Sequence, residues 1–431
     1  MTLTDRILAV LDVLGIARAH VATQLAGDIA GLAAAHPDRM AGVALVAPTR
    51  IDPTAFAGLG ERLLYIRPEG GMLARTAASA LPQLPAAQTA LLEGYAAEGW
   101  TDLGADRPDL VDRIAAHMTA IGGADTGSGP EQSGEVADIR YHVLGQGPVL
   151  LLTPMALAPS QWEPLLPALA ERFRVVALAG PKLGMLALLE ERAALADWRR
   201  MCASLFDDLA LAPGASVLDV GCGSGAVAIQ FARHTGGRNP LTALDLSPYL
   251  LGEARIAAAK ADAAIAFAPG SAETLPFAAD SFDAAYTITV LEECDAAKAL
   301  AELKRVVKPG GRVAVVVRAT EMHQWWNLPV SPETRARFSL PAQSVSAAGV
   351  ASAKLYDLAL AAGLEPVRMG PYTVSSERTD GPVLGQPEAY ALSLLTPAER
   401  KEYFAAKAEA IAAGTFFMTR GHHVFVGTVP G

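Results

Sequence analysis

The sequence has few cysteines, few charges and no long apolar run. Its three cysteines are Cys202, Cys222 and Cys294. They include no CxxC pair and no Cys/His cluster, so neither a disulfide framework nor a metal site is indicated. The apolar runs Val149–Leu152 and Val313–Val317 are far shorter than the ~20 residues of a membrane-spanning helix. We therefore expect a soluble, cytoplasmic protein with no metal and no membrane partner.

The chain also lacks a basic stripe and a signal peptide. With 35 basic and 45 acidic residues its net charge is -10, so nothing suggests a surface that would neutralise nucleic acid. The first 15 residues carry acids inside their apolar stretch and show no small-residue cleavage pattern. The expected partner is a small-molecule substrate, and a homodimer is left open.

What is present is a long folded chain. Its 431 residues exceed one usual hydrophobic core, and 51% hydrophobic content excludes disorder. Residues 122–136 are rich in Gly, Ser and acids, which is typical of a linker. From Ser216 onward, short β-branched runs alternate with Ala-rich windows, which predicts parallel strands joined by helical crossovers. We predict an α/β protein whose domains are 1–188 and 189–431, the second with a doubly wound sheet.

The strongest motif is a glycine-rich turn. In SVLDVGCGSG a strand pattern runs directly into Gly221, Gly223 and Gly225, and a helix pattern follows. Glycines at such a turn allow close approach of a ligand, and the helix N-terminus offers free amides. The next strand ends in Asp245, whose carboxylate can accept both hydroxyls of a ribose. A nucleoside site is therefore predicted.

The glycines alone also fit the fingerprint of dinucleotide-binding proteins. The downstream segments PGSAETLPF (269–277) and LKRVVKPGGRVAVVV (303–317) favour another reading. In order and spacing, these motifs resemble class I S-adenosylmethionine-dependent methyltransferases, and most closely the branch of ubiquinone and menaquinone biosynthesis. The resemblance covers about 198–430. It implies S-adenosylmethionine as cofactor and S-adenosylhomocysteine as product.

The resemblance also implies roles for single residues. Asp219 and the loop 221–225, with Cys222, would hold the methionine part of the cofactor, while Asp245 and Leu246 would lie at the ribose. Ser271 and Ala272 would contact the adenine. The family usually has Asp at the position of Ser271, so Ser271 is either a neutral substitute or an ordinary loop serine.

Two further segments are candidates for the acceptor side. Glu292 and Glu293 follow the fourth strand, and one of them is either a base or an acidic residue favoured at a helix N-terminus. Because adjacent carboxylates cannot both enter one pocket from a regular element, we expect one to be solvated. The resemblance suggests substrate contacts from the EMHQWW segment and from the final stretch, namely His323, Trp325, Trp326 and Arg420. His422, in the same final stretch, is a third candidate catalytic residue.

Alternatives remain for these segments. The two tryptophans either wall a substrate pocket or pack a domain interface. The final stretch, GTFFMTRGHHVFVGTVP, is expected to form the last two strands of the sheet as a hairpin. Alternation along a strand puts His422 and His423 on opposite faces, so that only one can face substrate. A vicinal histidine pair on a strand is also a poor metal chelate.

The first half resembles an α/β-hydrolase in permuted order. Residues 5–48 resemble the nucleophile region and 62–120 the last strands, while 139–184 resemble the beginning of that fold. Thr23 stands in the nucleophile's place without flanking glycines. Glycines stand near the positions of the usual acid (Gly70 or Gly71) and histidine (Gly99), and Pro154 supplies no oxyanion amide.

We therefore predict a methyltransferase that acts on a small molecule, preceded by a catalytically inactive, permuted hydrolase-like domain that binds substrate or mediates dimerisation. Two alternatives are a non-catalytic cofactor-binding scaffold and a hydrolase with an unconventional site at Thr23. A generic α/β domain would also explain the first half. The acceptor atom cannot be read from motifs, because pocket shape decides it.

Overall fold

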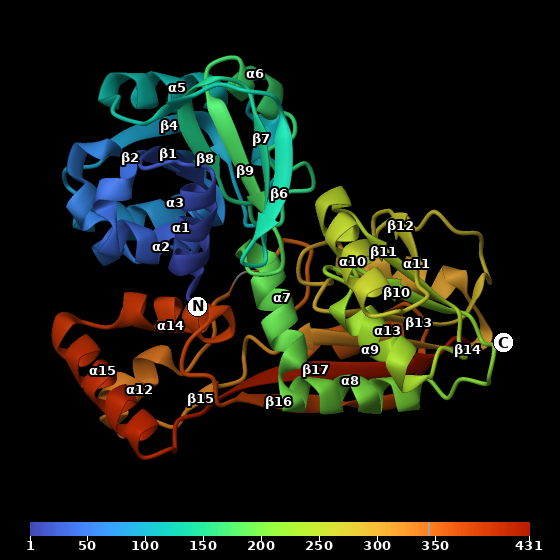
Figure 1. Cartoon of the computed structure of the whole chain (residues 1–431). Coiled ribbons are helices and arrows are strands. Elements are labelled where there is room, and N and C mark those ends of the chain that lie inside the picture. The colour runs from blue at the N-terminus through green and yellow to red at the C-terminus, as the bar shows by residue number, and fades with distance from the viewer. Residues whose placement is uncertain (344) are drawn as a thin grey trace. The chain divides into compact units, whose positions relative to one another are not determined.

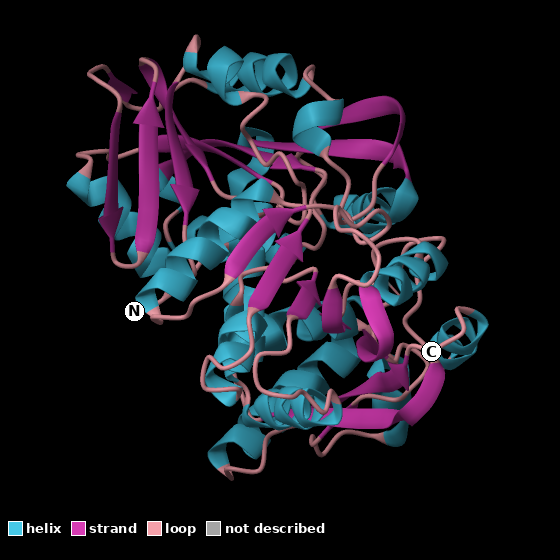
Figure 2. Ribbon diagram, turned by 90° about the vertical axis from the view of Figure 1, so that its right-hand side faces the viewer, coloured by secondary structure: helices cyan, strands magenta, loops and turns pink. Residues whose placement is uncertain are grey.

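The computed structural model describes residues 1–343 and 345–431. The chain divides into two compact units, Met1–Ala187 and Leu188–Gly431 (Figure 1). Each unit is an α/β structure with helices alongside a mixed sheet (Figure 2). Within the described residues, no helix has the length and apolar character needed to cross a membrane.

The first unit is built on a nine-stranded sheet of order β4-β3-β2-β1-β8-β9-β7-β6, with β5 paired to β8. Strand β7 is antiparallel to both of its neighbours, and β5 is antiparallel to β8; the other pairs are parallel. The strands are β1 (Ala19–Thr23), β2 (Met40–Val46), β3 (Leu63–Gly70), β4 (Gln88–Ala96), β5 (Thr126–Gly127), β6 (Gln132–Val136), β7 (Ile139–Leu144), β8 (Gly147–Leu152) and β9 (Arg174–Ala179).

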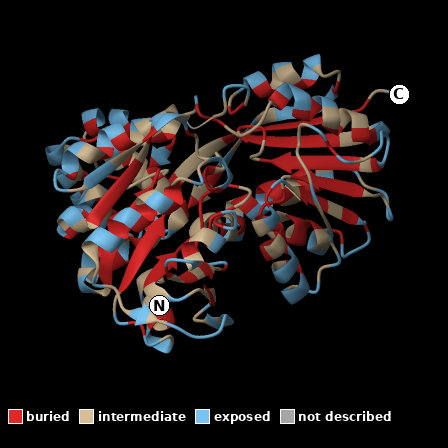
Figure 3. Cartoon of the chain, turned by 90° about the horizontal axis from the view of Figure 1, so that it is seen from above, coloured by how far each residue is buried: buried red, intermediate tan, exposed pale blue. Residues whose placement is uncertain are grey.

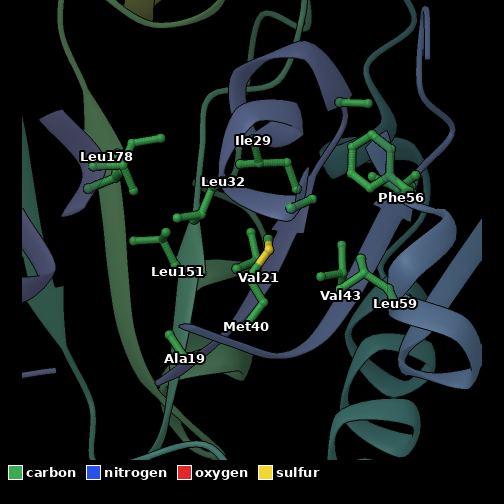
Figure 4. Close-up of a cluster of buried hydrophobic side chains, with 14 of the residues drawn as sticks. Ala19, Val21, Ile29, Leu32, Met40, Val43, Phe56, Leu59, Leu151 and Leu178 are labelled. Carbon is green, nitrogen blue, oxygen red and sulfur yellow. The ribbon is translucent and has the colours of Figure 1, made fainter. Parts of the chain in front are cut away.

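Both faces of this sheet are covered by helices, because successive strand residues enter two different cores. Val21 packs on one face and Ala22 on the other. Figure 4 shows the first core, in which Val21, Val43 and Leu151 lie beside side chains of α2. The helices are α1 (Leu3–Val13), α2 (Ala26–Ala35), α3 (Gly71–Ala80), α4 (Leu103–Asp106), α5 (Leu110–Ile121) and α6 (Leu166–Ala170), and α7 (Gly184–Ala194) runs across the unit boundary.

The predicted linker is shorter than expected. Residues Gln132–Val136 form β6, the edge strand that pairs antiparallel with β7. The carboxylate of Asp125 accepts the amide hydrogens of Ala17 at 2.6 Å and Arg18 at 3.1 Å, so the start of the segment is also fixed. A polar edge strand carries little apolar pattern, and for this reason the segment looked like a linker in the sequence.

The second unit has an eight-stranded sheet of order β12-β11-β10-β13-β14-β17-β15, with β16 paired to β17. The strands from β12 to β14 are parallel, as predicted, whereas β17 is antiparallel to its neighbours. They are β10 (Val217–Val220), β11 (Leu241–Asp245), β12 (Ala266–Pro269), β13 (Phe282–Ile288), β14 (Val307–Arg318), β15 (Trp325–Trp326), β16 (Glu365–Ser376) and β17 (Met418–Thr428).

Helices again cover both faces of the second sheet. Helices α8 (Ala196–Asp208), α9 (Ala226–His234) and α10 (Pro248–Lys260) contribute to one core, and α11 (Ala296–Val306) and α13 (Lys354–Ala361) to the other. A third core belongs to α12 (Pro332–Phe338), α14 (Pro382–Leu394) and α15 (Pro397–Ala412). The strands are largely buried, while the helices keep an exposed face (Figure 3).

The expected terminal hairpin is wrong. The final stretch contributes one strand, β17, and its antiparallel partners are β14 and the earlier strand β16. Gly421, near the middle of this stretch, lies inside the strand and is paired with Thr373.

Candidate functional site

The glycine-rich loop links the end of β10 to the start of α9. Gly221 has φ +77°, and a Cβ at this residue would collide with the side chain of Val290. Gly223 has φ +54°, and a Cβ there would lie 3.0 Å from Leu189 Cδ1. Only glycine suits these positions. Gly225, the N-cap of α9, has no side chain to cap the helix, so its first amides are available to a ligand.

Two carboxylates lie beside this loop. Asp245, the last residue of β11, accepts the amide hydrogens of Gly223 at 2.8 Å and Ser247 at 2.9 Å. Each carboxylate oxygen keeps a further lone pair that a ribose hydroxyl can use. Asp219 is 3% exposed and accepts the hydroxyl hydrogen of Tyr286 at 3.0 Å. Burial raises the pKa of Asp219 to about 8.

The remaining cofactor candidates lie along the same sheet edge. Leu246 follows β11 and is 59% exposed, which is unusual for a large apolar side chain and suits contact with a flat ligand. Ser271 and Ala272 follow β12, and Ser271 Oγ accepts the amide hydrogen of Glu273 at 3.2 Å. Cys222 is buried, and burial raises the pKa of its thiol. Parallel strands bind ligands at this carboxyl edge, so the loop, the acids and these residues together fit a nucleoside cofactor.

Of the two adjacent glutamates, Glu292 is fully buried and Glu293 is the partly exposed one. The expectation that the two carboxylates cannot point to one place is wrong. Both carboxylates lie 3.5 Å from the guanidinium of Arg318, and the side chain of Glu293 is 29% exposed. They share one partner because they sit in a turn, where strand or helix periodicity does not apply. Asp295, and neither glutamate, caps α11.

The glutamates differ in their surroundings. Glu292 Oε1 accepts the amide hydrogen of Arg318 at 2.7 Å, so this carboxylate also secures the end of β14. Burial raises the pKa of Glu292, and it raises that of Glu293 to about 7. The pKa of Glu293 therefore lies near neutral pH.

The predicted alternation of the two histidines is confirmed. His422 lies edge-on to Trp198 of α8, with ring centroids 5.4 Å apart, whereas His423 lies against Tyr356 of α13. Burial lowers the pKa of His422 to about 3, so its imidazole is neutral at physiological pH. His423 instead bonds to Tyr356 and to Glu321 Oε1, the latter at 2.7 Å.

The tryptophans of EMHQWW have separate surroundings. Trp326 is 1% exposed and packs against Phe338 and Tyr403 in the core of α12, α14 and α15, which gives it a packing role. Trp325 is 47% exposed beneath Arg335, whose guanidinium lies 4.4 Å from the ring centroid. His323 is exposed. The structure does not bring this segment into contact with the glutamates.

Sequence reasoning missed Arg192. Its guanidinium lies 4.4 Å from the ring centroid of Trp198, and its charge acts on both Glu292 and His422. Burial lowers its pKa to about 10, so it remains a cation at neutral pH. One arginine in the helical stretch LEERAA carries no local signal, and only its neighbours in the fold distinguish it.

Comparisons with known proteins agree with this geometry. The family model described as "Methyltransferase domain" matches residues 218–315. The chain is 33% identical over 126 residues to the ubiquinone/menaquinone biosynthesis C-methyltransferase of Geotalea daltonii. This alignment covers 28% of this chain and 52% of the relative. It is 39% identical over 117 residues to the malonyl-[acyl-carrier protein] O-methyltransferase of Pseudescherichia vulneris, covering 26% and 44% respectively.

Among solved structures, a geranyl diphosphate C-methyltransferase from Streptomyces coelicolor A3(2) aligns with a TM-score of 0.34 and 19% identity, over 53% of this chain and 78% of that one. The chain spans about half the length of the curated relatives named above. The second unit contains a class I S-adenosylmethionine-dependent methyltransferase domain. Its cofactor is S-adenosylmethionine, and S-adenosylhomocysteine is the product.

Proposed function

We propose that the whole protein transfers a methyl group from S-adenosylmethionine to a small-molecule acceptor. The observation that carries this proposal is the glycine loop with Asp219 and Asp245 at the carboxyl edge of the sheet, inside the matched residues 218–315. When bound, the cofactor supplies an electrophilic methyl group on a positively charged sulfur.

The protein's main contribution is alignment of the acceptor with that methyl group in a site that excludes water. The loop 221–225 binds the methionine part together with Asp219, while Asp245 and Leu246 hold the ribose side. Ser271 and Ala272 approach the adenine, and the hydroxyl of Ser271 replaces a charged acceptor with a neutral one.

Glu293 serves as the base for an acceptor that is not already ionised, and takes its proton. Its raised pKa, about 7, matches neutral pH, where a general base is most effective. Glu292 positions Arg318, and His422 stays neutral and offers a hydrogen bond. A Glu293→Gln variant that keeps full turnover at all pH values would remove Glu293 from this role.

The first unit is a non-catalytic, permuted α/β-hydrolase-like domain. If the permutation is undone, β6 to β9 become the first to fourth strands and β1 to β4 become the fifth to eighth. Across the sheet from β6 to β4, the renumbered strands lie in the order 1-2-4-3-5-6-7-8, and the second strand is antiparallel to its neighbours. That order is the one found in α/β-hydrolases, and it supports both the resemblance and the permutation.

Its former catalytic position is filled by structural hydrogen bonds. Thr23 is fully buried, has no positive φ, and accepts hydrogens from the Thr153 hydroxyl at 2.6 Å and the Leu25 amide at 2.9 Å. The side-chain oxygen of Gln24 accepts the amide hydrogen of Ala156 at 2.9 Å. These contacts argue against a hydrolase that uses Thr23, because its hydroxyl is buried and accepts two structural hydrogen bonds, and Pro154 offers no amide at the oxyanion position.

The test is incubation of the purified protein with methyl-labelled S-adenosylmethionine and a small-molecule extract. We expect label in small molecules and none after Asp245→Ala, a variant whose fold is checked by circular dichroism. Binding of S-adenosylhomocysteine without transfer to any extract component would favour the alternative of a cofactor-binding scaffold.

A further inference from the structure

Four buried polar atoms near the carboxyl edge of the second sheet have no hydrogen-bond partner within the described part of the chain. They are Trp198 Nε1, Glu292 Oε2, Glu293 Oε2 and His422 Nδ1. A buried polar atom without a partner destabilises the fold, and folded proteins contain few of them. These four atoms lie in one region of the fold, and polar groups of a ligand could supply their missing partners.

These atoms belong to one connected cluster. Trp198 touches His422, and His422 is paired in register with Arg318 across β17 and β14. Arg318 in turn contacts both glutamates, and Arg192 covers the ring of Trp198. We name these six residues the acceptor cluster: Arg192, Trp198, Glu292, Glu293, Arg318 and His422.

Two close contacts tie the acceptor cluster to the cofactor loop. Val290, two residues before Glu292, fills the space where Gly221 would carry a side chain. Leu189 fills the corresponding space beside Gly223. It precedes Arg192 by three residues, which is about one helical turn. The cluster therefore lies next to the loop that binds the methionine part of the cofactor, from which the methyl group leaves.

The charges in the cluster favour an anion. Arg192 and Arg318 are cations at neutral pH, and the charge of Arg420 also reaches His422. Against them stand two carboxyl groups, of which Glu293 is only partly ionised because its pKa is about 7. Trp198 Nε1 adds a buried donor. Cations and donors outnumber acceptors, and the sulfonium of the cofactor increases this excess.

We propose that Arg192 and Arg318 bind an anionic oxygen of the methyl acceptor, so that the acceptor is a small carboxylic acid or phenol. This inference rests on the proposed methyltransferase function and adds the substrate class. Arg192 is a binding residue supplied by α7, and Arg318 holds the same anion while Glu292 positions it.

The experiment titrates small probes into protein saturated with S-adenosylhomocysteine. Benzoate and 4-nitrophenolate at pH 8, where both are ionised and Arg192 is still a cation, are the anionic probes, and benzamide is the neutral probe similar in shape to benzoate. The variants are Arg192→Met, Arg192→Lys and Trp198→Phe. Arg233→Met is the matched control, because Arg233 is exposed on α9 outside the cluster.

We expect saturable binding of at least one anionic probe, and benzoate against phenolate identifies which oxygen anion is preferred. Arg192→Met should weaken it about tenfold or more, since hydrogen bonds to charged groups contribute about 1.5–3 kcal/mol. Arg192→Lys should retain part of the affinity, Trp198→Phe should weaken it through the lost donor, and Arg233→Met should change nothing.

Equal binding of benzamide, unchanged affinity in both Arg192→Met and Trp198→Phe, or no saturable binding of either anion would overturn the inference. Each of these results is read only on protein that binds S-adenosylhomocysteine. Loss of that binding in the unmodified chain would instead overturn the proposed function.

Discussion

Cofactor affinity should depend on the ionisation of Asp219. The pKa of this buried carboxyl group is about 8, because burial disfavours its charged form. The methionine part of the cofactor carries an ammonium group, which pairs with a carboxylate and not with a neutral acid. With a pKa of about 8, about 10% of Asp219 is ionised at pH 7 and about 90% at pH 9.

Because the bound state requires the ionised form, ionisation of Asp219 should by itself raise affinity about tenfold between pH 7 and pH 9, with a midpoint near pH 8. At pH 7, binding should release nearly one proton. Isothermal titration with S-adenosylhomocysteine in two buffers of different ionisation enthalpy measures that release.

Tyr286→Phe is the matched variant. The Tyr286 hydroxyl donates to Asp219 at 3.0 Å and lowers its pKa, so its removal should move the midpoint of the affinity profile to higher pH. The ligand's own amino group titrates identically in both proteins, so the comparison isolates Asp219. A flat profile with no proton release at pH 7, unchanged by Tyr286→Phe, would refute the reasoning.

Three further predictions concern the cofactor loop and the first unit. Gly221→Ala should weaken S-adenosylhomocysteine binding at least about tenfold, because the added methyl group collides with Val290. Gly214→Ala is the control: Gly214 has φ +85° with open space around it, so the affinity for S-adenosylhomocysteine, measured by titration, should not change. Asp245→Ala should abolish detectable binding with an unaltered circular dichroism spectrum, and normal affinity would exclude the ribose contact. Thr23→Val should lower the free energy of unfolding in urea by about 1–3 kcal/mol, because Thr153 loses its acceptor; a change in hydrolysis of activated esters would contradict the inactive site.

Local patterns predicted the second sheet and its glycine loop well. Buried parallel strands such as Val217–Val220 are continuous apolar runs, and the glycines at 221 and 223 are required by the local backbone. These features depend on neighbours in the sequence. Residue patterning therefore predicted the strands β10, β11, β13 and β14 as well as the position of the loop.

Other features depend on contacts between distant segments. The edge strand β6 is polar and looked like a linker, and Trp326 packs against helices that follow it by many residues. The two glutamates meet on Arg318 because a turn replaces regular structure. The contact of Arg192 with Trp198 depends on how α7 packs in the fold. No local period or spacing marks such contacts.

The most direct test of the account is titration of the purified chain with S-adenosylhomocysteine, beside a titration with a nicotinamide dinucleotide. We expect one-to-one, micromolar binding of S-adenosylhomocysteine alone, at the loop between β10 and α9. Binding of the dinucleotide alone would mean that the loop serves an oxidoreductase, and would contradict the methyltransferase assignment of the whole protein.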